Sequence, residues 1–294
     1  MKMRGAIIIS GEMRKPEGCV KTIEKLSEFC DLDVFVHAWD QVTWKVPLIK
    51  DAPEEIKLNI KKEKLDHKEL IEKIKPKKIL IEDKDALDPL IKLVKESTAC
   101  AYEKEGKEFK IPKNYDKKVK YTNATCMSQF YSARKSYDTY SEYSKENNIE
   151  YDFIIKSRSD IEIVVPEKDQ EDWFEEKIEK KIEWIKNCQM FEGQEGDKLF
   201  VFCPWVWLNN AGNPLIDWCL LFGQPKVFGL IYKDFPECLE RWKNDWGYGG
   251  DGKKGGQMRD FGFLFQERKI AARGPLPFLY RIKNPDETGW QNER

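Results

Sequence analysis

Residues 151–162 read YDFIIKSRSDIE. Residues 153–155 form an apolar run without alternation, which is typical of a strand buried on both faces of a sheet. This run leads directly into the charged residues Arg158, Asp160 and Glu162. In open α/β sheets, ligands bind at the carboxyl ends of such strands. The segment therefore predicts an inner strand of an α/β sheet and a polar site where that strand ends.

Three more apolar runs precede this segment, at residues 6–9, 33–39 and 77–82. An amphipathic stretch with helical spacing lies between the first two, at residues 19–30. A strand–helix–strand order with short connections indicates parallel pairing. We therefore expect an α/β fold with a Rossmann-type, mixed but mainly parallel sheet that is flanked by helices.

Outside these runs, a helix is predicted over residues 123–147, with Thr122 or Asn123 as its N-cap. The lysine-rich stretch 104–120 predicts a loop, and the charged stretch 50–76 predicts a surface helix and its approaches. No break in composition separates two domains, so residues 1–294 are expected to form one domain. The other predicted elements are helices over 173–184, 228–242 and 257–269, and strands at 199–202, 220–223 and 278–282.

The charge and composition of the chain exclude several classes of protein. Its 51 Lys and Arg and 52 Asp and Glu nearly cancel, whereas a general nucleic-acid binder carries a basic excess. No stretch approaches the ~20 apolar residues of a membrane span, and residues 5–9 are too short for a signal sequence. The eight cysteines include no Cys-x-x-Cys pair. We expect a cytoplasmic protein without a transmembrane segment or nucleic-acid partner.

Asp160 and Glu162 are the candidate metal ligands. Residues two apart on an extended segment point to the same side, and carboxylate oxygens suit Mg²⁺ or Mn²⁺ that also bind phosphate. Arg158 falls on that side and is expected to stabilise a diphosphate leaving group. The alternative is an ordinary strand end with solvated charges.

Ser10, Gly11 and Arg14 follow the first predicted strand and form a second candidate site. A short turn containing glycine offers backbone N–H groups to an anion or a nucleobase, and Arg14 adds a bidentate donor. The turn lacks the second and third glycines of a dinucleotide fingerprint. A tight strand-to-helix turn without a ligand is the alternative interpretation.

Three more polar residues are candidates near the same site. Asp40 closes the strand at 33–39 and is a candidate contact for a ribose or a base. Lys135, in the helix before the Asp160 strand, is a candidate contact for the phosphates or the base, with a solvated charge on the helix surface as the alternative. His37 lies beside Trp39, and we interpret it as a hydrogen-bonded core residue rather than a catalyst.

The order of these segments resembles a family of viral and bacterial glycosyltransferases with the GT-A fold, a Rossmann-like architecture that binds nucleotide sugars. The resemblance rests on Ser-Gly-x-x-Arg at 10–14, His-x-Trp-Asp at 37–40, the strand at 77–82, the helical segment 127–135 and the run at 151–160. It implies a nucleoside diphosphate sugar as donor substrate, bound by residues 1–165, and Asp160 in the metal-binding position.

The sequence departs from the family pattern at two points. Lys156 stands where the family more often has arginine, which keeps the charge but loses the fork of donors. Both histidines lie before residue 70, so the C-terminal histidine that completes the metal site of many GT-A enzymes is missing.

Residues 166–294 are expected to bind a glycan acceptor. An inverting enzyme needs a carboxylate base near the acceptor hydroxyl, and the candidates are Asp217, Asp251 and Asp260. Asp251 lies in a glycine-rich loop at 247–256, of the kind that closes over substrates.

Together, these features predict a transferase that moves a sugar from a nucleoside diphosphate sugar to a glycan hydroxyl with the help of Mn²⁺ or Mg²⁺. Two alternatives stay open. A sugar nucleotidyltransferase shares the fold type and the metal carboxylates, and a non-catalytic module that binds glycans or nucleotides is compatible with the many tryptophans.

Overall fold

The long apolar strand β1 (Arg4–Gly11) lies inside a seven-stranded sheet in the computed structural model. It pairs in parallel with β2 (Asp31–Trp39) on one side and with β6 (Phe153–Ser157) on the other. Its side chains alternate between two hydrophobic cores, with Ile7 in one core and Ile8 in the other. Because both cores are apolar, the strand needs hydrophobic residues on both faces, which explains its uninterrupted run.

The structure describes only part of the chain, and the statements below concern that part. Within it, no helix is both long and apolar enough to span a membrane. The predicted helix over 257–269 and the loop at 247–256 lie outside the described residues. These residues are 2–13, 16–45, 60–87, 115–165, 171–187, 199–204, 206–208, 214–216, 219–232, 270–273, 276–278, 280–283 and 290–292.

The sheet has the strand order β12-β8-β11-β6-β1-β2-β5. Six strands share one direction, and β11 runs antiparallel to both of its neighbours. The prediction of a mixed, mainly parallel α/β sheet is therefore confirmed. The strands not yet bounded are β5 (Lys78–Glu82), β8 (Leu199–Phe202), β11 (Leu221–Gly223) and β12 (Ile270–Arg273).

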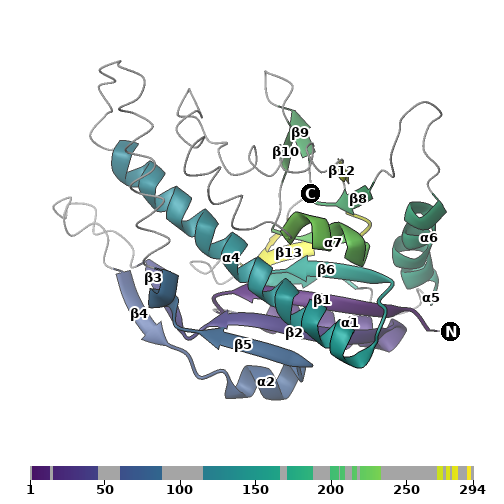
Figure 1. The fold of residues 1–294 in the computed structure, drawn as a ribbon, viewed down its shortest axis with the longest axis horizontal. Coiled ribbons are helices and arrows are strands. Elements are labelled where there is room, and N and C mark those ends of the chain that lie inside the picture. Colours follow the sequence, from purple (N-terminus) through teal and green to yellow (C-terminus); the bar gives the residue numbers. More distant parts are fainter. Residues whose placement is uncertain are drawn as a thin grey trace.

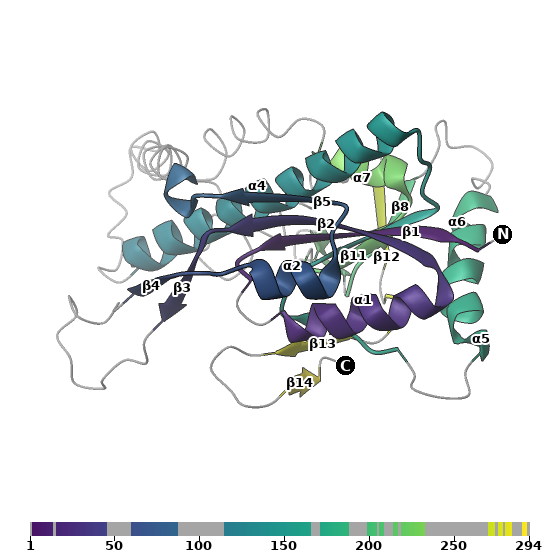
Figure 2. The same cartoon turned by 90° about the horizontal axis from the view of Figure 1, so that it is seen from below.

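Helices cover both faces of the sheet, and Figure 2 shows the resulting layers. The helices α4 (Tyr115–Asn147) and α7 (Pro225–Tyr232) pack on one face, where Phe130 and Phe228 belong to the same core. On the other face, α1 (Glu17–Phe29) and α2 (Lys68–Ile74) share the second core. The structure thus has three layers, helices–sheet–helices.

Smaller elements surround the main sheet (Figure 1). A second sheet joins β7 (Ile161–Ile163), β13 (Tyr280–Lys283) and β14 (Trp290–Asn292), and two-stranded ribbons pair β3 (Gln41–Lys45) with β4 (Ile60–Lys64) and β9 (Val206–Leu208) with β10 (Pro214–Ile216). A 3₁₀ turn, η1 (Lys84–Leu87), follows β5. The helix α5 (Glu171–Phe174) continues through a π-helical stretch, η2 (Glu175–Glu179), into α6 (Lys180–Asn187).

The predicted start of the long helix is wrong, and a strand lies in the predicted approach to the surface helix. The helix α4 begins at Tyr115 and not at residue 122 or 123, so the end of the predicted loop 104–120 is helical. Lysine is a good helix former, and no glycine or proline interrupts residues 115–147. In the stretch 50–76, strand β4 pairs with β3 before α2 starts. The Asp66 side chain accepts the backbone N–H of Lys68 at 3.0 Å just before this helix, whose N-cap residue His67 makes no side-chain capping bond.

We predict that Gly5→Ala destabilises the fold by about 1–3 kcal/mol, because a Cβ at this position would lie 2.3 Å from Cζ of Phe153. Urea unfolding of the single variant measures this loss. The double variant Gly5→Ala/Phe153→Leu should lose less than the sum of the two single variants, since leucine removes the clashing ring atoms. A loss below about 0.5 kcal/mol for Gly5→Ala would contradict the predicted close packing of β1 on β6.

Candidate functional site

The carboxyl ends of β1 and β6 lie at the point where the strand order of the sheet changes direction. From β1 the chain continues outward to β2 and β5, whereas β6 lies on the other side of β1. Ligands of open α/β proteins bind at such a topological switch point. The Ser159 hydroxyl donates to the backbone carbonyl of Glu12 at 2.9 Å. The loops that follow the two strands therefore meet at this point.

Arg158 and Asp160 form an ion pair in the loop after β6. The Nε–H of Arg158 donates to Oδ1 of Asp160 at 2.9 Å, and Nη2 of the same guanidinium pairs with Oδ2. Burial is the largest single influence and lowers the pKa of Arg158, but the charges and hydrogen bonds of Asp160 and Cys219 together raise this pKa above its usual value. Arg158 therefore holds Asp160 in a bidentate pair.

Glu162 lies on β7, between Ile161 and Ile163, whose side chains are buried in the core. Its Oε2 atom is buried and has no hydrogen-bond partner in the part of the chain that the structure describes. Among those same residues, no three His, Cys, Asp or Glu side chains gather into a metal-binding group. Within the part of the chain that the structure describes, the predicted pair thus consists of Asp160, a carboxylate held by an arginine, and Glu162, a carboxylate with one buried oxygen that accepts no hydrogen bond.

The first turn of α1 lies near Asp160. Burial, followed by the negative charges of Asp160 and Glu17, raises the pKa of the Cys19 thiol to about 12. No side chain caps this helix, because its N-cap residue is Pro16. The helix α1 therefore starts beside the switch point, but Glu17 places a negative charge in its first turn.

The predicted turn after β1 is described up to Met13. Gly11 is the last residue of β1 and has φ +110°, a conformation that favours glycine, and a Cβ there would meet no atom within 4 Å. Ser10 is buried at the register position opposite His37 of β2. Arg14 lies outside the described residues. The structure thus places the glycine of this candidate site at the open edge of the sheet.

Asp40 belongs to a chain of polar contacts that joins the ends of three strands. Its Oδ1 accepts the backbone N–H of Lys84, which follows β5, at 3.2 Å. The ammonium group of Lys84 forms an ion pair with Glu12, which follows β1. Asp40, the predicted ribose or base contact, therefore supports the start of the η1 turn.

Lys135 lies on α4 beside a cluster of polar side chains around the buried His37. Nδ1 of His37 lies 2.6 Å from the Ser132 hydroxyl, and Nε2 lies 2.8 Å from Oε2 of Glu82. The other oxygen of Glu82 lies 3.3 Å from the Tyr131 hydroxyl and 4.0 Å from Nζ of Lys135. His37 is fully buried, so the structure agrees with its interpretation as a hydrogen-bonded core residue.

The protonation of His37 follows from its partners. A carboxylate only accepts hydrogen bonds, so Nε2 carries the proton toward Glu82, and the Ser132 hydroxyl donates to Nδ1. Burial lowers the pKa of His37, although Glu82 opposes this shift. The folded protein therefore favours the neutral imidazole.

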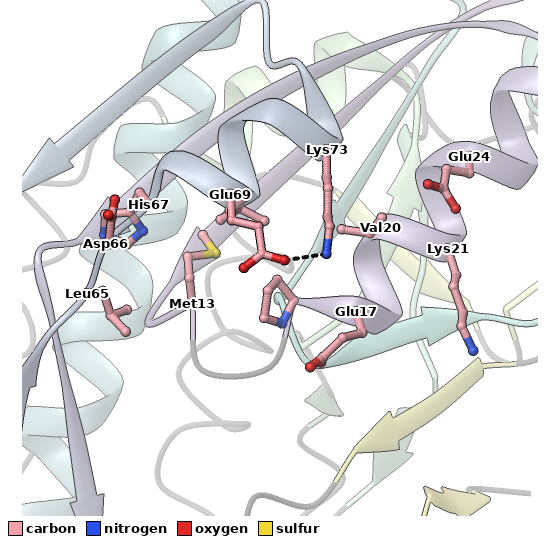
Figure 3. Close-up of a pocket in the computed structure, with 12 residues that line it drawn as sticks. Met13, Glu17, Val20, Lys21, Glu24, Leu65, Asp66, His67, Glu69 and Lys73 are labelled. Atoms are coloured by element: carbon pink, nitrogen blue, oxygen red, sulfur yellow. Dashed lines mark hydrogen bonds and ion pairs between the residues drawn. The ribbon is translucent and has the colours of Figure 1, made fainter.

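A groove of about 470 Å³ runs between α1 and α2 (Figure 3). It adjoins the ends of β1 and β2, because Met13 lines it after β1 and Nε2 of the lining His67 donates to the backbone carbonyl of Trp39 at 3.0 Å. An ion pair of 2.6 Å between Glu69 and Lys73 lies along one wall. The other lining residues are Pro16, Glu17, Val20, Lys21, Glu24, Leu65, Asp66 and Leu70.

Some candidate residues lie outside the described part of the chain, and some residues at the site were not predicted. Asp217, Asp251 and Asp260 lie outside the described residues. Glu12, Lys84 and Glu82 were not predicted as site residues. The sequence held a signal for Glu82, because it closes a predicted strand in the same way as Asp40 closes its own, and the carboxyl-end rule applies equally to both.

We predict that His37 makes the fold sensitive to acid. Below pH ~6.5 the unfolded chain protonates this histidine while the fold, with its lowered pKa, disfavours the proton. The stability that the neutral imidazole of His37 contributes is therefore lost as the pH falls from ~6.5 through the lowered pKa of His37. Between pH 7 and 5.5, the free energy of unfolding should fall less in His37→Gln than in the wild type.

Urea unfolding at the two pH values measures this difference. Ser132→Ala is the matched control, because it removes a hydrogen bond from the same imidazole but keeps the titrating group. Equal losses in the wild type and in His37→Gln would show that His37 does not cause the acid sensitivity.

Comparisons with known proteins identify no relative of this chain. The chain has no significant match among protein-family models, among curated proteins or among solved structures.

Proposed function

We propose that this protein is a glycosyltransferase that moves a hexose or deoxyhexose from a nucleoside diphosphate sugar to a glycan hydroxyl. One observation carries the proposal: Arg158, Asp160 and Glu162 follow inner strand β6 at the switch point next to β1. This is the position at which α/β proteins bind phosphate-bearing ligands. The GT-A fold, inferred from the order of motifs, is part of the proposal.

Arg158 is the proposed contact for the diphosphate. Its guanidinium already forms a bidentate pair with a carboxylate, Asp160, and the same planar fork matches phosphate oxygens. A diphosphate at this position can therefore accept the hydrogen bonds that Arg158 donates to Asp160. As the sugar–phosphate bond breaks, a fixed positive charge stabilises the negative charge that develops on the leaving group.

The carboxylates of Asp160 and Glu162 fit a Mn²⁺ or Mg²⁺ ion that arrives with the diphosphate. Magnesium is commonly bound through one or two carboxylates plus substrate phosphates, not by a closed protein cage. The buried Oε2 of Glu162, which has no hydrogen-bond partner among the described residues, is an acceptor of the required kind. When bound, the ion would neutralise charge on the diphosphate, and Arg158 would supply a second positive charge.

The groove between α1 and α2 supports a binding site for the nucleobase. Its volume of about 470 Å³ falls within the ~300–1,000 Å³ range of small-molecule sites. It adjoins the turn in which Ser10, Gly11 and Arg14 are the proposed nucleotide contacts, with Asp40 and Lys135 as further candidates. The acceptor half is assigned to residues 166–294, with Asp217, Asp251 and Asp260 as candidate bases.

We predict that one nucleotide sugar, tested among the UDP-, GDP- and dTDP-sugars and the monophosphate CMP-sugars, raises the melting temperature of the protein and that Mn²⁺ enlarges the shift. Ligand at a hundredfold excess over its dissociation constant stabilises the native state by ~2.7 kcal/mol. Asp160→Asn should lose the Mn²⁺-dependent part of the shift, because it removes one of the two carboxylates. A thermal-shift titration measures both effects.

The matched control is Glu146→Gln, which neutralises an exposed carboxylate on α4 in an ion pair of 3.7 Å with Lys78. This variant should respond like the wild type. Full metal-dependent transfer by Asp160→Asn would refute the metal assignment. Release of pyrophosphate would identify a nucleotidyltransferase, and binding without hydrolysis or transfer would identify a binding module.

A further inference from the structure

Glu82 is the open end of an otherwise enclosed polar cluster. It is the last residue of β5, at the same edge of the sheet as Gly11 and Arg158. Its side chain is 24% exposed, whereas His37 beneath it is fully buried. Lys135, which lies 4.0 Å from the carboxylate, is 34% exposed. A hydrogen-bond acceptor and a donor are therefore presented side by side at the edge where ligands bind.

We propose that Glu82 and Lys135 bind a vicinal diol of the substrate, and that His37 is a positioning residue for Glu82. This inference rests on the proposed function and names two contacts within the same site. A hydroxyl group both donates and accepts. One hydroxyl of a diol can donate to the carboxylate while its neighbour accepts from the ammonium group. A nucleotide sugar and a glycan both carry such diols, on the ribose or on a hexose.

The geometry of Glu82 is fixed by contacts from two neighbouring elements. His37 on β2 holds Oε2 at 2.8 Å, and Tyr131 on α4 lies 3.3 Å from Oε1. Lys135 lies over the Tyr131 ring, 5.3 Å from its centre, and burial, with the charge of Glu82, raises the pKa of this tyrosine to about 12. The tyrosine therefore stays a neutral donor, and the carboxylate keeps one orientation before a ligand arrives. Such pre-organisation lowers the entropic cost of binding.

The structural alternative is that the cluster only ties α4 to the sheet. His37 links Ser132 of α4 to Glu82 of β5 across β2, and this link stabilises the fold whether or not a ligand binds. A tether and a ligand contact differ in one respect. Only a ligand contact makes binding depend on the hydroxyl groups of the ligand.

Two substitutions of His37 separate its two hydrogen bonds. Gln places an amide N–H where Nε2 lies and can keep the bond to Glu82, whereas Asn places its amide near Nδ1 and keeps only the bond to Ser132. Each variant loses one of the two hydrogen bonds of His37, so both variants are expected to lose stability. Only His37→Asn removes the hydrogen bond that orients Glu82. Glu82→Gln removes the carboxylate charge at a partly exposed position, and Glu142→Gln on the outer surface of α4 is the control.

The experiment measures dissociation constants of these variants by calorimetry in three arms. The first compares UDP, GDP and CDP with their 2′-deoxy forms. The second compares each nucleotide sugar with its nucleoside diphosphate. The third uses methyl glycosides of glucose, galactose and mannose, so that binding of a hexose is tested without a nucleotide.

If the diol is the ribose, loss of the 2′-hydroxyl should weaken wild-type binding about tenfold, as expected for a hydrogen bond to a charged group. This ratio should approach one in Glu82→Gln and His37→Asn and persist in His37→Gln and Glu142→Gln. If the diol belongs to a hexose, the same variants should instead weaken nucleotide-sugar or glycoside binding about tenfold, with nucleoside diphosphate binding unchanged.

The inference would be overturned if Glu82→Gln and His37→Asn bound every ligand as tightly as the wild type does. It would also be overturned if no arm showed binding that depends on Glu82. Failure of the proposed function looks different. In that case the wild type binds no nucleotide in the first two arms, while Glu82-dependent glycoside binding in the third arm would still support the diol contact.

Discussion

The parallel pairing of β1 with both β2 and β6 determines where the polar residues of the site lie. The register pairs Ser10 with His37 and Ile9 with Ser157, so the three strands end at one edge. Parallel strands cannot be joined by tight turns, and the chain must leave this edge through loops and return along helices. Residues that follow the strands are therefore collected at the carboxyl edge, although up to about 150 positions of sequence separate them, as the bond from Ser159 to Glu12 shows.

Charged side chains at this edge are paired with one another. Arg158 holds Asp160, Lys84 holds Glu12, and Glu82 lies between His37 and Lys135. A half-buried charge needs such a partner because its desolvation is costly. In the proposed function, a charged substrate would bind by exchanging partners with groups that are already oriented, and the exchange would place the same donors on phosphate or hydroxyl oxygens without creating an isolated charge.

The sequence predicted the strands of the main sheet better than its surroundings, for a physical reason. Strands such as β1 and β6 are buried on both faces, so their composition alone identifies them. The boundary of α4 and the strand β4 depend on contacts or propensities spread over charged residues, where apolar periodicity is weak. For the site, the sequence placed Arg158 and Asp160 together, but it gave no sign that they pair with each other. Side-chain pairing across strands, as between His37 and Glu82, depends on register, which a single sequence leaves open.

The two edges of the sheet use charged residues differently. At the amino edge, Asp33 accepts from Arg4 at 3.0 Å and from the Tyr151 hydroxyl at 2.7 Å, with Lys77 at 3.5 Å. Among the described residues, one buried nitrogen of Arg4 has no hydrogen-bond partner, but the charge of Arg4 is paired with Asp33, and the Asp33 side chain is almost enclosed. At the carboxyl edge, Glu82 is partly open. Glu82 is 24% exposed and Asp33 only 8%, although Arg4 and Lys77, the partners of Asp33, are 39% and 46% exposed. An almost enclosed carboxylate stabilises the fold and offers little contact to a ligand, whereas an oriented carboxylate at a partly open position can serve both roles. The exposure of the carboxylate, and not the number of charges, therefore favours the carboxyl edge as the proposed site.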